Sequence, residues 1–546
     1  MLTKLYPRMS ALPVLVLSMV SLFAGCAKTA DSENIETKSV KLTVDVVGVE
    51  EVPAVSNNKL KTNRGSSNAT PDVINSKDLI SFESFDAQIS LEKWSSKVKK
   101  KSNMRSESNN MQSTESEAPS MEEGITYRIL FYKSDGSFVH STQMVSGIPG
   151  EITLNRGESY DWYAVSYHNS DPMPAPDPAA PELVVPHNTD LLYASGSIEI
   201  PAQGSGEVPP LNVLFSHRYA RIVLELNSMG MFGDMNQVGL EVSGVTGTTA
   251  SFNLKDASLS NISSEPVNFD FEDFSNLEFG YADRKVTYIY TAREEPIDLN
   301  VSVHALDIKL SNGTNRIFSD LMASPAEFEF SLTPQIGTSY AATINFVESP
   351  LIVNSVRWAR TNLYYHGGHN PYRFLPTNAH TNARNTYFSF RGMLPGQYGI
   401  SLTNGDPCAL VYPEGLWRTV RFNDLMMITP VFPIETYKTE NGLGYYEYDD
   451  TQGTGTPYPS AKLRFNMNGF GTATGVVDGD VAIDLGSSYG RSAHVWSTFA
   501  HDVGRGMEVY SYLATFSGGD EIAYEPVNYS GTGPVESTFK NIRCVR

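Results

Sequence analysis

The stretch LNVLFSHRYARIVLEL, residues 211–226, carries the strongest β-strand signal in the middle of the chain. Aliphatic and aromatic residues dominate it, as is typical of strands. We place the first domain boundary inside it, between residues 215 and 216. Strand patterns recur on both sides of this stretch and no long amphipathic helical pattern appears, so the sequence predicts an all-β protein.

Residues 39–215 form the predicted first domain, an antiparallel β-sandwich. Its first strand is predicted over residues 40–46, where apolar residues alternate with polar ones and would share one buried face. These apolar residues are Val40, Leu42, Val44 and Val46. Two polar stretches in this domain, 53–77 and 95–123, are predicted to be exposed loops or disorder.

Residues 216–349 form the predicted second sandwich, because strand patterns recur there about every ten residues. The second boundary is placed at Ser349-Pro350, since a proline cannot continue a strand ladder. Residues 350–546 are dense in Gly, Asn and aromatic residues, which indicates a domain with less regular structure.

The N-terminus has the pattern of a lipoprotein signal. An apolar run, too short to span a bilayer comfortably, ends in Leu22-Phe23-Ala24-Gly25-Cys26. We therefore predict a signal peptide over residues 1–25, lipidation of the Cys26 thiol, and a polar tether over residues 26–38. Two acyl chains would hold the exported chain at the outer membrane until it is cut. The alternative is an ordinary secretory signal with an accidental cysteine.

Composition and cysteine count narrow the function classes. The 546-residue chain carries a formal net charge of −20, so it has no excess of cations to replace the counterions of nucleic-acid phosphates. With Cys26 assigned to the lipid, Cys408 and Cys544 remain, and we expect one disulfide between them in an exported protein. Two unpaired thiols are the alternative. No later segment is apolar over 18 residues, so no second membrane anchor is predicted.

Four pieces of the chain resemble the fimbrillin family of lipoproteins, the subunits of type V pili of Gram-negative anaerobes. They are YRILFYKSDGSFV (127–139), ITLNRGESYDWYAVSYHN (152–169), DLLYA (190–194) and LFSHRYARIVLEL (214–226). With the lipoprotein signal, the resemblance covers residues 20–350 and implies two tandem, transthyretin-like pilin sandwiches. It also implies other pilin subunits as partners, joined by β-strand addition.

The resemblance also implies proteolytic maturation. In that family a trypsin-like protease cuts after a basic residue in an N-terminal loop, which removes the lipidated strand and opens a groove for a neighbour's strand. Residues 40–46 would be the removable strand here. Arg64 is the first candidate cut site and Arg105 the second. The alternative is that both polar stretches are solvated surface and are not cut.

The tail resembles a second family, the Fibrobacter-type major paralogous domain of bacterial surface proteins. The matching elements are GDPCALVYPEGLWRT (405–419), HVWST (494–498) and IRCVR (542–546). Here Thr419-Val420 follows the Trp-Arg pair, where that family usually has Leu-Pro-Thr. The resemblance implies a loop-rich, mixed α+β, C-type-lectin-like fold related to the formylglycine-generating enzymes. It also implies that Cys408 and Cys544 lie close together, in agreement with the cysteine count.

Three features of the tail are candidate ligand sites. His366 and His369 could approach a metal, but no further ligand is evident and a surface loop is the simpler interpretation. Four carboxylates lack the spacing of a calcium loop and fit acidic turns better; they are Asp449, Asp450, Asp478 and Asp480. Seven tyrosines could stack on sugars, although many must be core; they are Tyr364, Tyr365, Tyr372, Tyr445, Tyr446, Tyr448 and Tyr458. We expect no metal, no cofactor and no enzymatic activity, since no catalytic pattern is present.

The sequence therefore predicts an exported, cell-surface fimbrial subunit whose C-terminal domain binds a glycan or a host surface ligand. A whole domain follows the second sandwich, so no strand is evidently free for donation to a next subunit, and we predict a position at the pilus tip. One alternative is a surface lipoprotein that binds a glycan or host protein without polymerising. Another is a hydrolase or oxidoreductase built on the tail.

Overall fold

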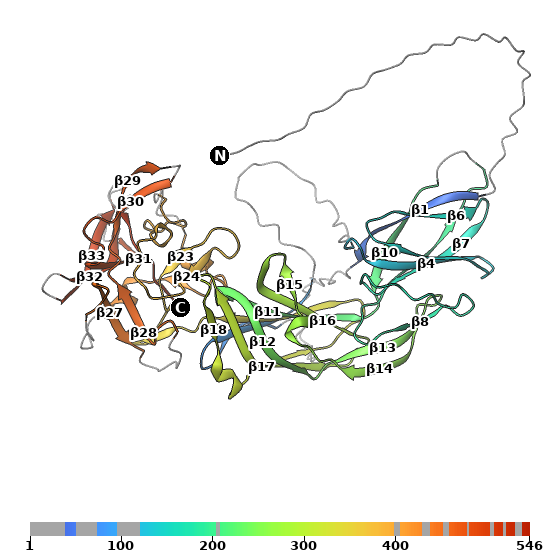
Figure 1. The fold of residues 1–546 in the computed structure, drawn as a ribbon, viewed down its shortest axis with the longest axis horizontal. Helices are drawn as coiled ribbons and strands as arrows, with labels where there is room; N and C mark the ends of the chain where they lie inside the picture. The colour runs from blue at the N-terminus through green and yellow to red at the C-terminus, as the bar shows by residue number, and fades with distance from the viewer. Residues whose placement is uncertain are drawn as a thin grey trace, which may run out of the picture.

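The computed structural model is an elongated all-β protein, as the sequence predicts (Figure 1). The structure describes residues 39–50, 74–94, 121–203, 208–397, 405–428, 437–450, 458–477, 480–502, 507–516, 520–529 and 538–546. Within these ranges the one α-helix is α1 (Phe422–Met426). The 3₁₀ turns are η1 (Phe271–Asp273), η2 (Ser319–Met322), η3 (Arg384–Thr386) and η4 (Pro407–Leu410). Among the described residues no helix is long and apolar enough to cross a membrane.

The first sandwich is built on a seven-stranded sheet that curves around its own core. In spatial order the strands are β5 (Phe138–Val145), β4 (Thr126–Lys133), β7 (Ser159–Ser166), β9 (Leu192–Glu199), β10 (Leu211–His217), β1 (Ser39–Glu50) and β6 (Gly150–Asn155). Strands from both ends of this order contribute to one buried cluster, in which Tyr127 of β4 and Leu42 of β1 are both buried. Tyr127 packs edge-on against Phe215 of β10.

A three-stranded sheet covers the other face of the first sheet and connects it to the second sandwich. Its strands are β14 (Leu259–Pro266), β13 (Thr246–Asn253) and β8 (Glu182–Val185). Leu130, Val165 and Phe252 meet in the core between these two sheets. In Figure 1, β8 lies beside β13, which pairs with β14 on its other side.

The second sandwich packs a six-stranded sheet against a four-stranded one. The first has the order β15 (Ser275–Glu278), β16 (Tyr281–Thr291), β11 (Ala220–Gly230), β20 (Ser339–Val347), β3 (Asp86–Lys93) and β2 (Ile74–Ser81). The other contains β12 (Gly233–Ser243), β17 (Ile297–Leu310), β18 (Asn315–Ile317) and β19 (Ala326–Leu332). Alternating apolar residues of β11, β17, β19 and β20 fill the core between them.

The structure corrects one part of the predicted domain division. Residues 74–93 were assigned to the first sandwich, but β3 pairs along its whole length with β20 of the second. β2 then pairs with β3, so residues 74–77 lie in a strand rather than in a polar loop. Phe85, Ala87 and Leu91 are buried in the second core. The chain therefore starts in the first sandwich, contributes two strands to the second, and then returns to the first.

The C-terminal domain consists of short sheets around two larger cores, with a small third cluster formed by Tyr387 and Phe539. Its described strands are β21 (Leu351–Val353), β22 (Val356–Trp358), β23 (Leu363–Tyr365), β24 (Tyr372–Phe374), β25 (Arg418–Thr419), β26 (Lys438–Glu440), β27 (Leu443–Asp449), β28 (Lys462–Asn466), β29 (Gly471–Val477), β30 (Asp480–Asp484), β31 (Ser492–Asp502), β32 (Met507–Phe516), β33 (Asp520–Tyr529), β34 (Thr538–Phe539) and β35 (Cys544–Val545). β35 lies inside one sheet, between β22 and β25. Trp358 and Trp417 are fully buried, one in each core.

Candidate functional site

The first candidate site is the slot that β1 occupies in the first sheet. β1 runs parallel to β10, with Val44 opposite Leu211, and antiparallel to β6, with Leu42 opposite Ile152. It is therefore an interior strand that is hydrogen-bonded on both sides. Its removal would leave β6 and β10 with unpaired backbone groups facing one gap, which is the arrangement that a new strand can fill.

The four apolar residues predicted to share one face of this strand all pack against the first core. Leu42 and Val44 are fully buried, and Val40 and Val46 are partly buried against the same cluster. Val47 continues the outward-facing alternation and is 45% exposed, but a shift in register between Val46 and Gly48 follows, so that Val49, the next odd position, is buried. The slot is therefore lined by the apolar residues of the first core, which form its apolar floor, and the alternation of buried and exposed residues along the strand changes after Val47.

The burial of β1 makes a direct prediction about its side chains. Replacing Leu42 with alanine is expected to lower the free energy of unfolding of the first sandwich by about 2–3 kcal/mol, because it empties fully buried volume. Val47→Ala on the same strand is the matched control and should change stability by less than about 0.5 kcal/mol, since Val47 is half exposed. Urea unfolding, monitored by hydrogen exchange of the amides in β6 and β10, measures the stability change of each variant. Equal effects of the two substitutions would contradict this placement of β1.

The connection that follows β1 determines how the strand could leave. Residues 51–73 link β1 to β2, and β2 belongs to the second sandwich rather than to the sheet that holds β1. A cut within this link would leave β1 attached to the downstream chain by its hydrogen bonds and packing alone. Arg64, Arg105 and Cys26 lie outside the described residues.

The second candidate site is the C-terminal domain, which a disulfide closes. Cys408 and Cys544 form the predicted bond, with 5.7 Å between their Cα atoms, and this expectation is confirmed. The carboxylate of Asp406 accepts hydrogen bonds from the backbone N–H groups of Cys408 and Thr419, at 2.9 and 2.8 Å. It thus holds the turn that carries Cys408 against β25, whose partner strand β35 carries Cys544.

A buried ionic cluster joins the C-terminal domain to the second sandwich. Glu348 follows β20 and lies between Arg316 of β18 and Arg360, which follows β22; its carboxylate is 3.2 Å from the Arg360 Nε atom. All three side chains are at most 6% exposed. Burial lowers the pKa of Arg360, and the negative charge of Glu348 opposes that shift. The cluster therefore depends on Glu348 to compensate two buried positive charges.

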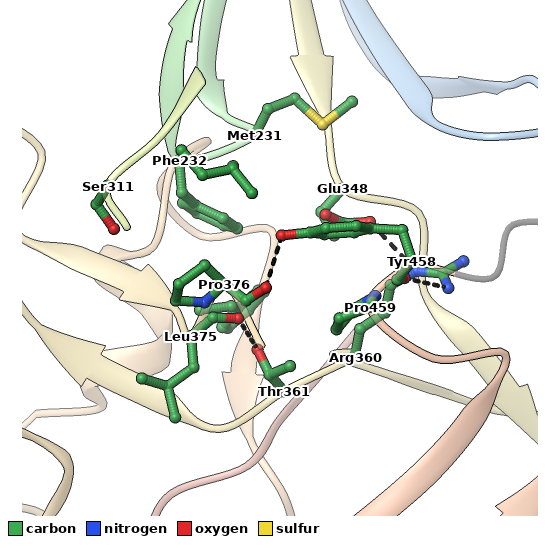
Figure 2. Close-up of a pocket in the computed structure, with 12 residues that line it drawn as sticks. Met231, Phe232, Ser311, Glu348, Arg360, Thr361, Leu375, Pro376, Tyr458 and Pro459 are labelled. Carbon is green, nitrogen blue, oxygen red and sulfur yellow. Dashed lines mark hydrogen bonds and ion pairs between the residues drawn. The ribbon is translucent and has the colours of Figure 1, made fainter. Parts of the chain in front are cut away.

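The pocket beside this cluster is closed by packing (Figure 2). The Tyr458 hydroxyl donates to the carbonyl oxygen of Pro376 at 2.8 Å, and Arg360 donates to the Tyr458 carbonyl oxygen at 2.9 Å. The Arg316 guanidinium lies over the Tyr458 ring, 4.2 Å from its centre. The remaining space is about 10 Å³, at most room for one water molecule. This pocket is a domain junction and not a ligand site.

Three further contacts fix the same junction. The His369 Nε2 atom is 2.8 Å from the Asp283 carboxylate of β16, and its Nδ1 atom is 3.3 Å from Glu278 of β15. Burial raises the pKa of Asp283, and His369 opposes that rise. Arg546 forms an ion pair with Asp86 of β3. His369, a candidate metal ligand from its spacing to His366, thus docks the C-terminal domain onto the second sandwich. Among the described residues no group of His, Cys, Asp and Glu is arranged to hold a metal.

The other candidate ligand residues of the tail, its tyrosines and carboxylates, mostly pack against neighbouring residues or pair with them. Tyr364, Tyr372, Tyr446 and Tyr448 are buried. The Arg464 guanidinium lies over the Tyr445 ring, with its Cζ atom 3.6 Å from the centre of the ring. Tyr365 packs edge-on against Tyr372. The carboxylate of Asp449 pairs with Lys462 and that of Asp450 accepts from the backbone N–H of Ile352. Asp478 and the side chain of Asp480 lie outside the described part of the chain. These tyrosines therefore do not form an exposed sugar platform.

His494 gives the C-terminal domain a pH dependence. Its ring is buried, packs against Phe470 and lies 3.0 Å from the Ser492 hydroxyl. Burial, and then the charge of Lys540, lowers the pKa of His494 to about 3, whereas an exposed histidine titrates near pH 6.5. The folded state thus holds the neutral ring. Its full stability is present above about pH 6.5 and is lost as the pH falls towards 3.

The expected result is a fall in the free energy of unfolding of roughly 2 kcal/mol between pH 7 and pH 5. His494→Gln removes the titrating group and should flatten that dependence, while His140→Gln, on β5 of the first sandwich, should leave it unchanged. Unfolding in guanidinium chloride at a series of pH values, monitored by tryptophan fluorescence, measures how the free energy of unfolding changes with pH. A His494→Gln slope equal to that of the wild type would refute this assignment.

Comparison with known proteins gives only distant structural likenesses. No protein-family model matches the chain, and no curated protein matches it. A crystal structure of a candidate cell adhesion protein from Bacteroides fragilis aligns at 12% identity and a TM-score of 0.28, covering 56% of this chain and 97% of that one. One from Bacteroides uniformis aligns at 10% identity and 0.25, covering 41% and 90%. The fimbrial anchor protein Mfa2 from Porphyromonas gingivalis aligns at 11% identity and 0.20, covering 38% and 78%. Likenesses at this level do not assign the chain to a family.

Proposed function

We propose that this chain is an exported fimbrial subunit that assembles through exchange of its first strand and presents an adhesive C-terminal domain at the pilus tip. The observation that carries the proposal is the position of β1. It lies between two hydrogen-bonded neighbours, covers an apolar floor, and is followed by a link, residues 51–73, that leads to a different sandwich. After a cut at Arg64, the strand could leave without breaking any covalent bond in the rest of the fold.

The slot also defines the chemistry of an incoming strand. Such a strand would need apolar side chains at alternate positions to replace Leu42 and Val44, and an irregularity to follow the break at Val47. Its backbone would complete the ladders of β6 and β10. Another pilin subunit supplies such a strand in this proposal, which is β-strand addition to a sheet that has lost one member.

The tip position is supported by the way the C-terminal domain is docked. It covers one end of the second sandwich through the Arg316–Glu348–Arg360 cluster and the His369–Asp283 contact. Strand β35 is paired on both sides and carries the disulfide, so it is not available for donation. In this proposal Cys26 carries the lipid that delivers the subunit to the outer membrane, and the chain is not an enzyme.

Limited trypsin treatment of the purified chain tests strand release. The expected products are a stable fragment whose N-terminus follows Arg64, or secondarily Arg105, and an N-terminal peptide that contains residues 39–50. Arg64→Ala and Arg105→Ala should each remove their own cut. Arg293→Ala is the matched control, because this partly exposed arginine lies in the second sandwich and its loss should not change the fragments.

Strand exchange is then measured with a labelled synthetic peptide of residues 39–50. The cut protein should bind it after release of its own strand, and a peptide with Leu42 and Val44 replaced by aspartate should not bind. A chain that trypsin never cuts in the two polar stretches, and that retains its N-terminus at Cys26 in cells, would favour the alternative of a surface lipoprotein that does not polymerise.

A further inference from the structure

The β2–β3 hairpin, residues 74–93, lies in the second sandwich although it precedes β4 of the first sandwich in sequence. β3 is hydrogen-bonded to β20 on one side and to β2 on the other. Just beyond β3, the Trp94 N–H donates to the Ser339 carbonyl oxygen at 2.8 Å. Residues 51–73 connect the hairpin to β1, and residues 94–125 connect it to β4. The hairpin is therefore an insert between two segments that belong to the other sandwich.

Polar contacts hold the turn of this hairpin, residues 82–85. The Ser84 carbonyl oxygen accepts hydrogen bonds from the Arg316 Nη2 atom at 3.2 Å and from the Ser349 hydroxyl at 3.3 Å. The Ser84 hydroxyl donates to the Asp320 carboxylate at 2.7 Å. Arg316 is also a member of the buried ionic cluster. The turn is thus fixed at the junction that docks the C-terminal domain.

The same turn inserts two aromatic rings into the second core. Phe85 is fully buried, and its ring centre lies 5.0 Å from that of Phe82. It also lies 5.6 Å from the ring centres of Phe318 and Phe346. Phe82 is partly buried and packs edge-on against Phe328, at 5.4 Å. Departure of the hairpin would expose these rings to water, so packing and hydrogen bonds hold it in place without need of a covalent link.

From this arrangement we propose that the hairpin retains the first strand and makes the two candidate cuts unequal. A cut after Arg64 separates β1 from the hairpin, whereas a cut after Arg105 leaves β1 attached to a hairpin that stays docked. Each cut hydrolyses one peptide bond, so water supplies the hydroxyl of the new carboxyl group and the hydrogen of the new amine. This inference rests on the proposed strand exchange and names the cut that controls it.

The tether explains why the cut after Arg105 does not open the slot. Residues 51–73 already span the distance between β1 in its slot and the docked hairpin. Return of β1 to the slot is then an intramolecular step, with an effective concentration on the order of 1 mM. A strand of another subunit at micromolar concentration would lose this competition. A chain cut only after Arg105 is therefore inhibited by its own first strand.

An arginine-specific protease applied to the full chain tests this proposal, because lysines lie close to both sites and would add tryptic cuts. The variant Arg105→Ala is cut only after Arg64 in the two polar stretches, and Arg64→Ala only after Arg105. With about 10 μM labelled peptide of residues 39–50, the chain cut after Arg64 is expected to take up roughly 100-fold more peptide than the chain cut after Arg105. Equal uptake by the two cut chains would overturn the proposal.

Wild-type chain cut at both sites separates retention of the hairpin from exchange of the strand. In native mass spectrometry, fragment 65–105 should stay with residues 106–546, while excess peptide displaces the N-terminal fragment that ends at Arg64. Loss of fragment 65–105 would overturn this inference. If that fragment stays bound but no cut chain takes up peptide, the docking of the hairpin is supported and the proposed strand exchange is refuted.

A pair of variants assigns the retention to the aromatic contacts of the hairpin. Phe82→Ala removes a partly buried ring and should speed the loss of fragment 65–105 about tenfold. Phe138→Ala is the matched control, since its ring is 41% exposed and lies on β5 of the first sandwich. Equal rates of loss in the two variants would contradict retention through these rings.

Discussion

Replacing Glu348 with alanine is expected to lower the free energy of unfolding by about 3–5 kcal/mol. The substitution leaves the guanidinium groups of Arg316 and Arg360 buried near each other with no negative charge between them. Neither arginine can escape to water without opening the junction, because both side chains are at most 4% exposed. The effect should appear as separation of the C-terminal domain from the second sandwich.

Hydrogen exchange locates this effect. Amides of β20, β21 and β22 should exchange faster in Glu348→Ala, while those of β7 in the first sandwich keep their wild-type rates. Glu327→Ala on β19 is the matched control, since that exposed carboxylate accepts a single hydrogen bond from Ser302. Replacing Arg316, Glu348 and Arg360 together with apolar residues should cost less than Glu348→Ala alone, because no buried charge is left uncompensated. A stability loss under 1 kcal/mol in Glu348→Ala would show that the junction does not depend on this cluster.

Replacing both Cys408 and Cys544 with serine is expected to destabilise the C-terminal domain by about 4–5 kcal/mol. The two residues are 136 positions apart, and the stabilisation from a cross-link grows with the length of the loop it closes. Both side chains are also fully buried where the disulfide joins η4 to β35, so the serines would leave hydroxyl groups in an apolar core. The domain should therefore unfold before the two sandwiches do.

Three buried tryptophans of this domain, Trp358, Trp417 and Trp496, report its unfolding through fluorescence. Wild-type protein treated with a reductant should approach the behaviour of the double serine variant, and the reductant should have no effect on the variant itself. Hydrogen exchange in β4 and β7 of the first sandwich provides the internal reference. If the double variant and the oxidised wild type unfold at the same denaturant concentration, the disulfide does not stabilise this fold.

Local patterns in the sequence were sufficient for the first strand and for the disulfide. The alternation of Leu42 and Val44 with polar residues is a period-two signal that depends on neighbouring positions alone, and both side chains lie in the core. The pairing of Cys408 with Cys544 followed from the small number of cysteines. The break in register at Val47 was not predicted, because a bulge depends on the partner strand as well as on the strand itself.

Long-range arrangements could not be obtained in this way. The segment of β3 alternates like any half-buried strand, and nothing in its own residues distinguishes a place in the first sheet from its observed pairing with β20. Glu348 lies next to the Ser349-Pro350 boundary and resembles a surface loop residue in sequence. Its partners Arg316 and Arg360 come from two different domains, so their meeting is visible only in the folded chain.

The double pairing of β1 also determines how its slot would respond to mechanical force. Hydrogen bonds to β6 and β10 run across the strand, so a pull along the strand axis shears all of them together, whereas a sideways pull would open them one after another. A strand seated in this slot and pulled along its own axis would therefore give way only when the whole ladder slides. If subunits are joined through this slot, as proposed, the drag of flowing liquid on the pilus would be shared by all the hydrogen bonds of the slot rather than concentrated at one.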